Sequence, residues 1–276
     1  MFPAPQPPRD MVMPGGLQAG LIVLLGICAA IAVLVLGRTA IRQRDRVPLF
    51  VVLGALLCVV YEPIGDTLVL AYYPEKGQIT WVTLFGRGIP VFIGLMYLCY
   101  IGPFVLLFEH LRGKGFTARS WWTLWVGSVA AIVVIELGVM RIGHAWVYYG
   151  PQRTVVADLP IWTPITYVSF LFTIAAGVHA LASRLRQRDQ WIIIPAVPAF
   201  LAAAHLTTSL PAAVALYSTD DSTMILVGAL GSIAVAALLA HGLSLLFVPQ
   251  RAPGVDTPSD QRAVTRAATS SGSTQS

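Results

Sequence analysis

Two acidic residues lie in the middle of an otherwise apolar segment, and their types and spacing could support acid–base chemistry. Glu62 and Asp66 belong to the run 48–73 and are four residues apart, so they share one face of a helix. Two carboxyls in one apolar site favour an arrangement in which one keeps its proton and the other is ionised. Such a pair suits reactions of an apolar substrate through an oxocarbenium ion or carbocation, and it also suits a proton-coupled carrier.

The composition places this acid pair in a membrane protein. Of the 276 residues, 56% are apolar and 11% are charged, compared with about 25% charged residues in a soluble domain. A carboxylate at the centre of a spanning helix costs roughly 2.5 to 3.5 kcal/mol, so its presence indicates function. Seven segments approach or exceed the roughly 20 residues that cross a bilayer, which predicts an all-α bundle of seven transmembrane helices in one domain, 17–248. The segments are 17–36, 48–73, 90–111, 121–140, 161–183, 191–217 and 223–248.

The basic residues predict the orientation of the bundle, because Lys and Arg accumulate in short cytoplasmic loops. Thirteen of the 18 basic residues fall on one side of the seven segments, and five fall on the other. This places the N-terminus outside and the C-terminus inside, in a multi-pass protein of the inner (plasma) membrane. The net charge of +5 is then explained by this bias, without a nucleic-acid partner. The five basic residues on the outer side are Arg9, Lys76, Arg87, Arg141 and Arg153.

The two ends of the chain have different compositions from the rest. Residues 1–16 are rich in proline and residues 249–276 are polar, so both are expected to be disordered. The first apolar segment runs into a basic cluster instead of a small-residue cleavage site, so it is expected to remain as a helix. Cys28, Cys58 and Cys99 all lie within predicted spans and indicate neither a disulfide framework nor a metal site.

Other helices bring polar groups to the same outer half of the bundle. Glu136 is expected to act as a third acid, and the alternative is a simple interfacial ion pair with Arg141. His205 is expected at the site, and the alternative is a packing histidine with its hydrogen bonds satisfied. No histidine has a ligand spacing such as H-E-x-x-H, so no metal is expected. The residues expected to bind substrate are Tyr61, Tyr97, Tyr100, Arg141, Trp162, Tyr167 and His205.

Two features near the acids bear on their surroundings. Pro63 predicts a helix break next to Glu62, which would open the backbone there. The outer connections 74–89 and 141–160 are aromatic and could form a lid. The alternative is an interfacial belt, in which Trp and Tyr lie at the level of the lipid headgroups. The aromatic residues concerned are Tyr72, Tyr73, Trp81, Trp146, Tyr148 and Tyr149.

Several short motifs resemble the AveC-like spirocyclase family. They are Tyr61-Glu62-Pro63 followed by Tyr72-Tyr73-Pro74, then Ile89-Pro90, and the stretch 135–143 (IELGVMRIG) leading to Tyr148-Tyr149-Gly150. The resemblance covers roughly residues 50–185. The acid before the proline is usually Asp in that family and is Glu62 here, and the position of Asp66 usually carries an amide-like residue.

The resemblance implies cofactor-independent acid–base chemistry on a hydrophobic, polyketide-like hydroxy-ketone. A dehydration would be followed by closure of two oxygen rings on one carbon, giving a spiroketal. In these terms Glu62 would be the acid and Asp66 the anion or base, with Glu136 and Arg141 orienting the substrate. Tyr61, Tyr97 and Tyr167 would donate hydrogen bonds or face the developing cation.

Two other functions fit the same sequence. One is a membrane-embedded terpene cyclase of the meroterpenoid type, whose acids protonate an epoxide or alkene. The other is not an enzyme: a lipid or sterol carrier, or a subunit of a larger complex, whose acids bind protons or a polar headgroup. A retinal protein is excluded because the only lysines, Lys76 and Lys114, are absent from the last span, so no Schiff base can form there. The oligomeric state is not predicted.

Overall fold

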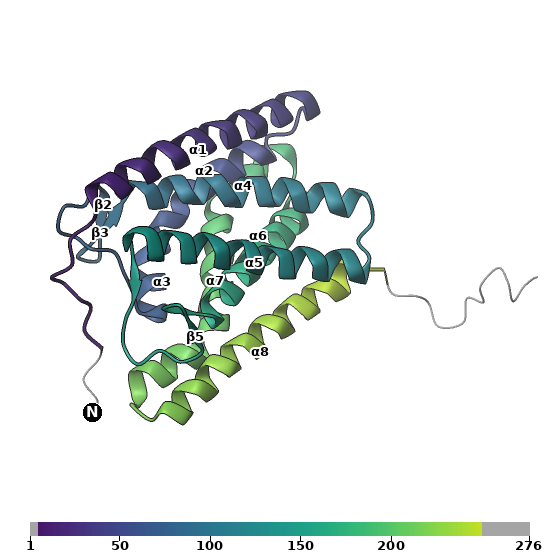
Figure 1. The fold of residues 1–276 in the computed structure, drawn as a ribbon. Coiled ribbons are helices and arrows are strands. Elements are labelled where there is room, and N and C mark those ends of the chain that lie inside the picture. The colour runs from purple at the N-terminus through teal and green to yellow at the C-terminus, as the bar shows by residue number, and fades with distance from the viewer. Residues whose placement is uncertain (1–4, 250–276) are drawn as a thin grey trace, which may run out of the picture.

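Seven long helices dominate the computed structural model, which describes residues 5–249 (Figure 1). Each is long and apolar enough to cross a membrane, which confirms the seven predicted helices. Two of the seven spans are composite, one made of α2, η1 and α3 and the other of η2 and α7. The helical elements are α1 Gly15–Gln43, α2 Val47–Leu57, η1 Cys58–Tyr61, α3 Glu62–Val69, α4 Val91–Gly113, α5 Ala118–Gly143, α6 Trp162–Ala182, η2 Gln187–Ile192, α7 Ile193–Ser218 and α8 Ser222–Phe247.

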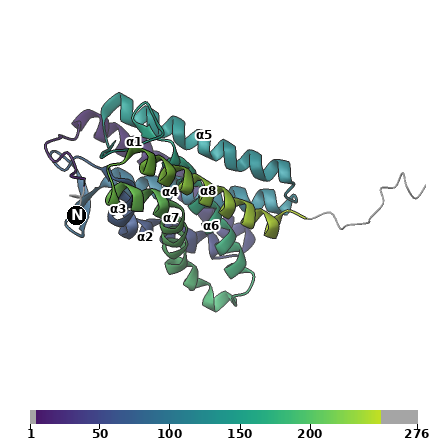
Figure 2. The ribbon, with the colours of Figure 1, turned by 90° about the horizontal axis from the view of Figure 1, so that it is seen from below.

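The helices run side by side, so the start of α1 and the end of α8 lie at opposite ends of the bundle (Figure 1). An odd number of antiparallel crossings requires this arrangement. The helices differ in how much of their surface the bundle covers. In α6, 56% of the most apolar window is buried, compared with 11% in α5. Figure 2 accordingly shows α5 along one margin of the bundle.

The predicted break at Pro63 is present in the second span. The α-helix stops at Leu57, four residues form the tighter η1, and α3 begins at Glu62 with Pro63 in its first turn. Proline is tolerated at that position because the first amides of a helix have no helical acceptor. The Glu62 amide still donates to the Val59 carbonyl, so the chain continues helically through η1 into α3, and Glu62 lies where the tighter turn ends.

The connections 70–90 and 144–161 contain short strands, which the prediction of a helical bundle did not include. Among residues 5–249 they form three two-stranded antiparallel sheets, pairing β1 with β4, β2 with β3, and β5 with β6. These pairings satisfy backbone groups in segments that have no helix to do so. The strands are β1 Ala71–Tyr72, β2 Thr80–Leu84, β3 Arg87–Pro90, β4 Val147–Tyr148, β5 Val155–Val156 and β6 Leu159–Pro160.

The N-terminal segment also differs from the expectation of disorder over 1–16. Helix α1 already begins at Gly15, and the Met13 side chain is buried. The amide of Met13 donates to the carbonyl of Lys76 at 2.8 Å, and Asp10 pairs with the Lys76 ammonium at 3.0 Å. Residues 1–4 lie outside the described residues, as does 250–276, almost all of the tail expected to be disordered.

Candidate functional site

A cavity of about 160 Å³ lies within the bundle, between α3, α4, α5, α6 and α7. Its wall is aromatic and aliphatic for the most part, with three carboxyls and a histidine. Eight of the ten predicted site residues line it: Tyr61, Glu62, Asp66, Tyr97, Tyr100, Glu136, Tyr167 and His205. The structure therefore brings these eight residues, from five helices, to one cavity.

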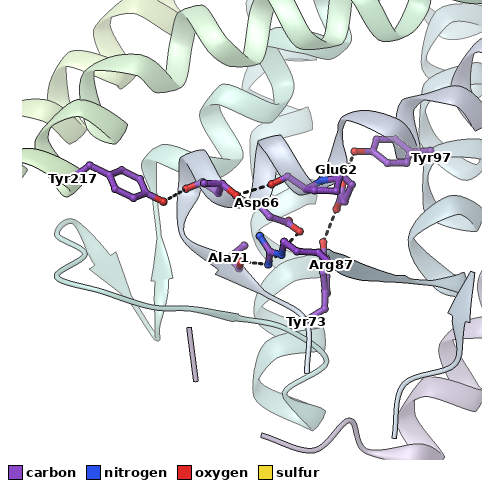
Figure 3. Close-up of polar contacts among 9 residues, drawn as sticks. Glu62, Asp66, Ala71, Tyr73, Arg87, Tyr97 and Tyr217 are labelled. Carbon is purple, nitrogen blue, oxygen red and sulfur yellow. Dashed lines mark hydrogen bonds and ion pairs between the residues drawn. The ribbon is translucent and has the colours of Figure 1, made fainter. Parts of the chain in front are cut away.

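Glu62 is held from two sides by tyrosine hydroxyls. Tyr73 donates to Oε1 at 2.7 Å, and Tyr97 on α4 donates to Oε2 (Figure 3). Burial, and then the neighbouring carboxylates, raise the pKa of Tyr73 well above its usual value, so this phenol keeps its proton and acts as a donor. Both oxygens of Glu62 thus serve as acceptors, an arrangement that stabilises a carboxylate.

Asp66 has a cationic partner that comes from outside its own helix. The Arg87 guanidinium, at the start of β3, lies with Nη2 3.6 Å from Oδ2 of Asp66 and donates to the Ala71 carbonyl at 3.0 Å (Figure 3). The distance to Asp66 is too long for a hydrogen bond, and Oδ2 has no hydrogen-bond donor among the described residues. The contact is therefore mainly electrostatic.

Glu136 forms a separate network on the α5 side of the cavity. Tyr148 donates to its Oε2 at 2.9 Å, and the Tyr148 oxygen lies 3.1 Å from that of Tyr167. Burial, followed by the nearby Glu136, raises the pKa of Tyr148 well above its usual value. The phenol thus remains a donor to this carboxyl.

Arg141 does not take the place that the sequence predicted for it. Its side chain is exposed and lies 3.9 Å from Asp158, and it is not part of the cavity wall. Neither the ion pair with Glu136 nor a substrate-orienting position is formed. Arg141 lies five residues beyond Glu136 on α5, so its side chain points about 140° away around the helix.

Trp162 also lies outside the cavity. It is buried in a second apolar cluster with Val69 and Leu70, and its Nε1 faces the Gln152 side chain at 3.4 Å. This position at the first turn of α6 gives it a packing role next to the acid-bearing helix. The prediction that it binds substrate is not supported by its place in the fold.

His205 on α7 faces the cavity among aromatic rings. Tyr61, Tyr167 and Phe170 approach it with ring centroids 5.7, 5.5 and 6.0 Å away. Its Nε2 and the Tyr61 hydroxyl are buried without a hydrogen-bond partner in the described part of the chain. Buried polar atoms in proteins are nearly always bonded, so these two atoms are available to a ligand.

Four residues of the two connections contact the acids or line the cavity but were not predicted as site residues: Tyr73, Arg87, Trp146 and Tyr148. The sequence assigned the three aromatic residues to an interfacial belt as the alternative to a lid, whereas all three line the cavity. The signal was the aromatic composition of the connections 74–89 and 141–160. Composition does not reveal which side chains turn inward.

Comparisons with protein-family models, curated proteins and solved structures find no match to this chain. The resemblance to AveC-like spirocyclases therefore remains a hypothesis that rests on the short motifs. Within residues 5–249, no cluster of three or more His, Cys, Asp or Glu side chains has the geometry of a metal site.

Proposed function

We propose that this chain is a membrane-embedded, cofactor-independent cyclase that acts on a hydrophobic hydroxy-ketone by dehydration and spirocyclisation. One observation carries the proposal: carboxyls from two different helices, each hydrogen-bonded by tyrosine, line a single cavity with aromatic walls. Carboxyls can transfer protons and stabilise a cation, and aromatic faces attract cations. An oxocarbenium ion in this cavity would be surrounded by both kinds of group.

The contacts of each acid support a division of roles. Glu62 accepts from two phenols and Asp66 faces Arg87, so we assign both to the ionised form. Glu136 has one phenol donor and no cation within ion-pair distance in residues 5–249, so we assign it the role of proton donor. This assignment reverses the role that the sequence suggested for Glu62.

In the proposed reaction, one hydroxyl of the substrate adds to the ketone and forms a cyclic hemiketal. Glu136 then protonates the hemiketal hydroxyl, which leaves as water, and the oxocarbenium ion faces Glu62 and Asp66. A second hydroxyl attacks this carbon, and Glu62 accepts its proton. One water is lost, two carbon–oxygen rings share one carbon, and no oxidant or reductant is consumed. The proton that Glu62 has accepted must return to Glu136 before the next turnover.

We further propose that the bundle lies in the plasma membrane with its N-terminus outside and its C-terminus inside. The distribution of basic residues supports this orientation, and the cavity would then lie in the outer half of the bilayer. Within residues 5–249, Arg87 is the only lysine or arginine within ion-pair distance of Glu62, Asp66 or Glu136.

The test is mass spectrometry of lipid extracts from cells with and without the protein. Glu136→Gln and Glu62→Gln should each lower product formation by at least about 100-fold, the usual size of a general acid–base contribution. Glu109→Gln is the matched control, since it also removes a carboxylate from a spanning helix but pairs with Arg112 and His179 away from the cavity. Full turnover in both cavity variants would refute the proposal. Retention of a bound lipid without any product would identify a carrier, and a carbocyclic product would identify a terpene cyclase.

A further inference from the structure

The outer end of the cavity is closed by protein. Strands β1 and β4 pair across it, with Ala71 opposite Tyr148 and Tyr72 opposite Val147. Ala71, Tyr72 and Tyr73 are buried, and so is Trp146 just before β4. A ligand that arrived from the water above the bundle would have to separate these strands.

The side of the cavity is different, because its wall there is apolar and reaches the surface. Met96 on α4 and Ile132 and Ile135 on α5 line it. Ile135 is 59% exposed and is the one exposed residue among those that line the cavity. It lies within a predicted span, so its exposed surface would face lipid chains.

Helix α5, which carries Ile132 and Ile135, is also the least covered by the rest of the bundle among the seven helices. Only 11% of its most apolar window is buried. Ile135 and Glu136 lie three and four residues beyond Ile132 on α5, and all three line the cavity. A molecule that enters past Ile135 therefore meets the Glu136 carboxyl directly inside.

The size of the cavity sets a limit on what it can enclose. A cavity of about 150 Å³ accommodates benzene, so about 160 Å³ holds little more than one ring. The substrate class proposed above must form two rings and has an apolar chain as well. Most of such a molecule has to remain outside the closed part of the cavity.

We propose that the cavity opens sideways between α4 and α5, at Met96, Ile132 and Ile135, and that a lipid-dissolved substrate enters there and leaves its apolar chain in the bilayer. This inference rests on the proposed function for the identity of the substrate, but the opening itself is tested without turnover. Only the oxygen-bearing end of the substrate reaches the acids. The enzyme would then accept substrates with different apolar chains and discriminate between substrates by the groups at their oxygen-bearing end.

The probe is a long-chain alkyl ketone with a diazirine beside the carbonyl, added to the full-length protein in phosphatidylcholine vesicles. After illumination, mass spectrometry of peptides measures labelling at Leu171 and Leu201, which line the cavity from α6 and α7. Labelling of α1, whose surface is largely exposed, is the internal reference. Ile135→Trp narrows the opening and should lower labelling inside the cavity about tenfold relative to α1, equivalent to roughly 1.4 kcal/mol of binding.

Val134→Trp is the matched control, because Val134 is 70% exposed on the same helix and does not line the cavity. Its labelling should equal that of the wild type. Unchanged labelling in Ile135→Trp, or an equal decrease in both variants, would overturn the sideways opening. If labelling depends on Ile135 but Glu62→Gln and Glu136→Gln keep turnover, the opening stands and the cyclase proposal fails. If the acids are essential but Ile135→Trp has no effect on labelling, the cyclase proposal stands and the sideways opening fails.

Discussion

Arg87 approaches Asp66 from a β-hairpin and not from the helix bundle, with Nη2 3.6 Å from Oδ2 of the carboxylate. The carboxyl is 5% exposed and the guanidinium 21% exposed. The hairpin turns through Phe85 and Gly86, both with positive φ, and β3 then starts at Arg87. The cation that balances the acid-bearing helix thus depends on a turn outside the spans.

Removal of this cation should destabilise the protein. We expect Arg87→Met to lower the free energy of unfolding in detergent by about 3 kcal/mol, because it leaves a buried carboxylate unpaired. The double variant Arg87→Met with Asp66→Asn should recover most of the loss. Thermal unfolding of the two variants and the wild type measures this, and equal Tm values for the single and double variants would contradict the pairing.

The two phenols on Glu62 should matter for turnover. Tyr73→Phe removes a donor to a charged acceptor, a loss of about 2 kcal/mol, which corresponds to roughly a thirtyfold lower rate if the bond is fully used in the transition state. Tyr72→Phe is the control, since the neighbouring Tyr72 is also buried but donates to no acceptor in the described residues. Product formation per amount of folded protein distinguishes the two. A similar rate in both variants would show that the Tyr73 hydroxyl does not contribute to turnover.

Helices α7 and α8 approach each other closely at Gly228. A Cβ there would lie 2.6 Å from Cβ of Ala215 and 2.7 Å from the Pro211 carbonyl oxygen, and small residues permit such close packing in membranes. We expect Gly228→Ala to destabilise the fold by about 1 to 3 kcal/mol through overpacking. Gly242→Ala on the same helix meets no atom within 4 Å and should leave the Tm unchanged or raise it. The opposite order of Tm values would contradict this packing.

The start of α8 should show a pH-dependent contribution to stability. Asp221 accepts from the amides of Thr223 at 2.7 Å and Met224 at 3.2 Å, and these backbone hydrogen bonds lower its pKa. The capping contribution is therefore fully present above the ordinary Asp pKa of about 3.9 and is lost as the pH falls through the lower folded value. Asp221→Ala should have a lower Tm than the wild type at neutral pH, and the difference should vanish in acid.

Asp221→Asn separates the charge from the cap. Asparagine caps helices about as well as aspartate but does not titrate. The Asp221→Asn variant should therefore keep the contribution of the cap to its Tm at acid pH. Tm values of the three proteins between neutral pH and about pH 2 test the assignment. An Asp221→Ala deficit that persists at the acid end would show that the carboxylate is not the source of the effect.

The sequence alone determined the parts of this protein that depend on local properties. Length and hydropathy predicted seven spans, with ends that differ from those observed by one to seven residues. The proline after Glu62 predicted the break in the second span. Rise per residue placed Glu62, Asp66, Glu136 and His205 at related depths, because depth along a helix follows from position in the chain.

Only the tertiary structure decided which partners these acids have. Depth does not fix how a helix is rotated about its axis, and the rotation of α5 turned Glu136 toward the cavity and left Arg141, on another face of the same helix, near Asp158. The partners Tyr73, Arg87 and Tyr148 come from connections whose course depends on pairing between distant strands, such as Ala71 with Tyr148. Such pairing is a nonlocal choice of register, and for that reason the sequence revealed the acids but not the tyrosines and the arginine that hold them.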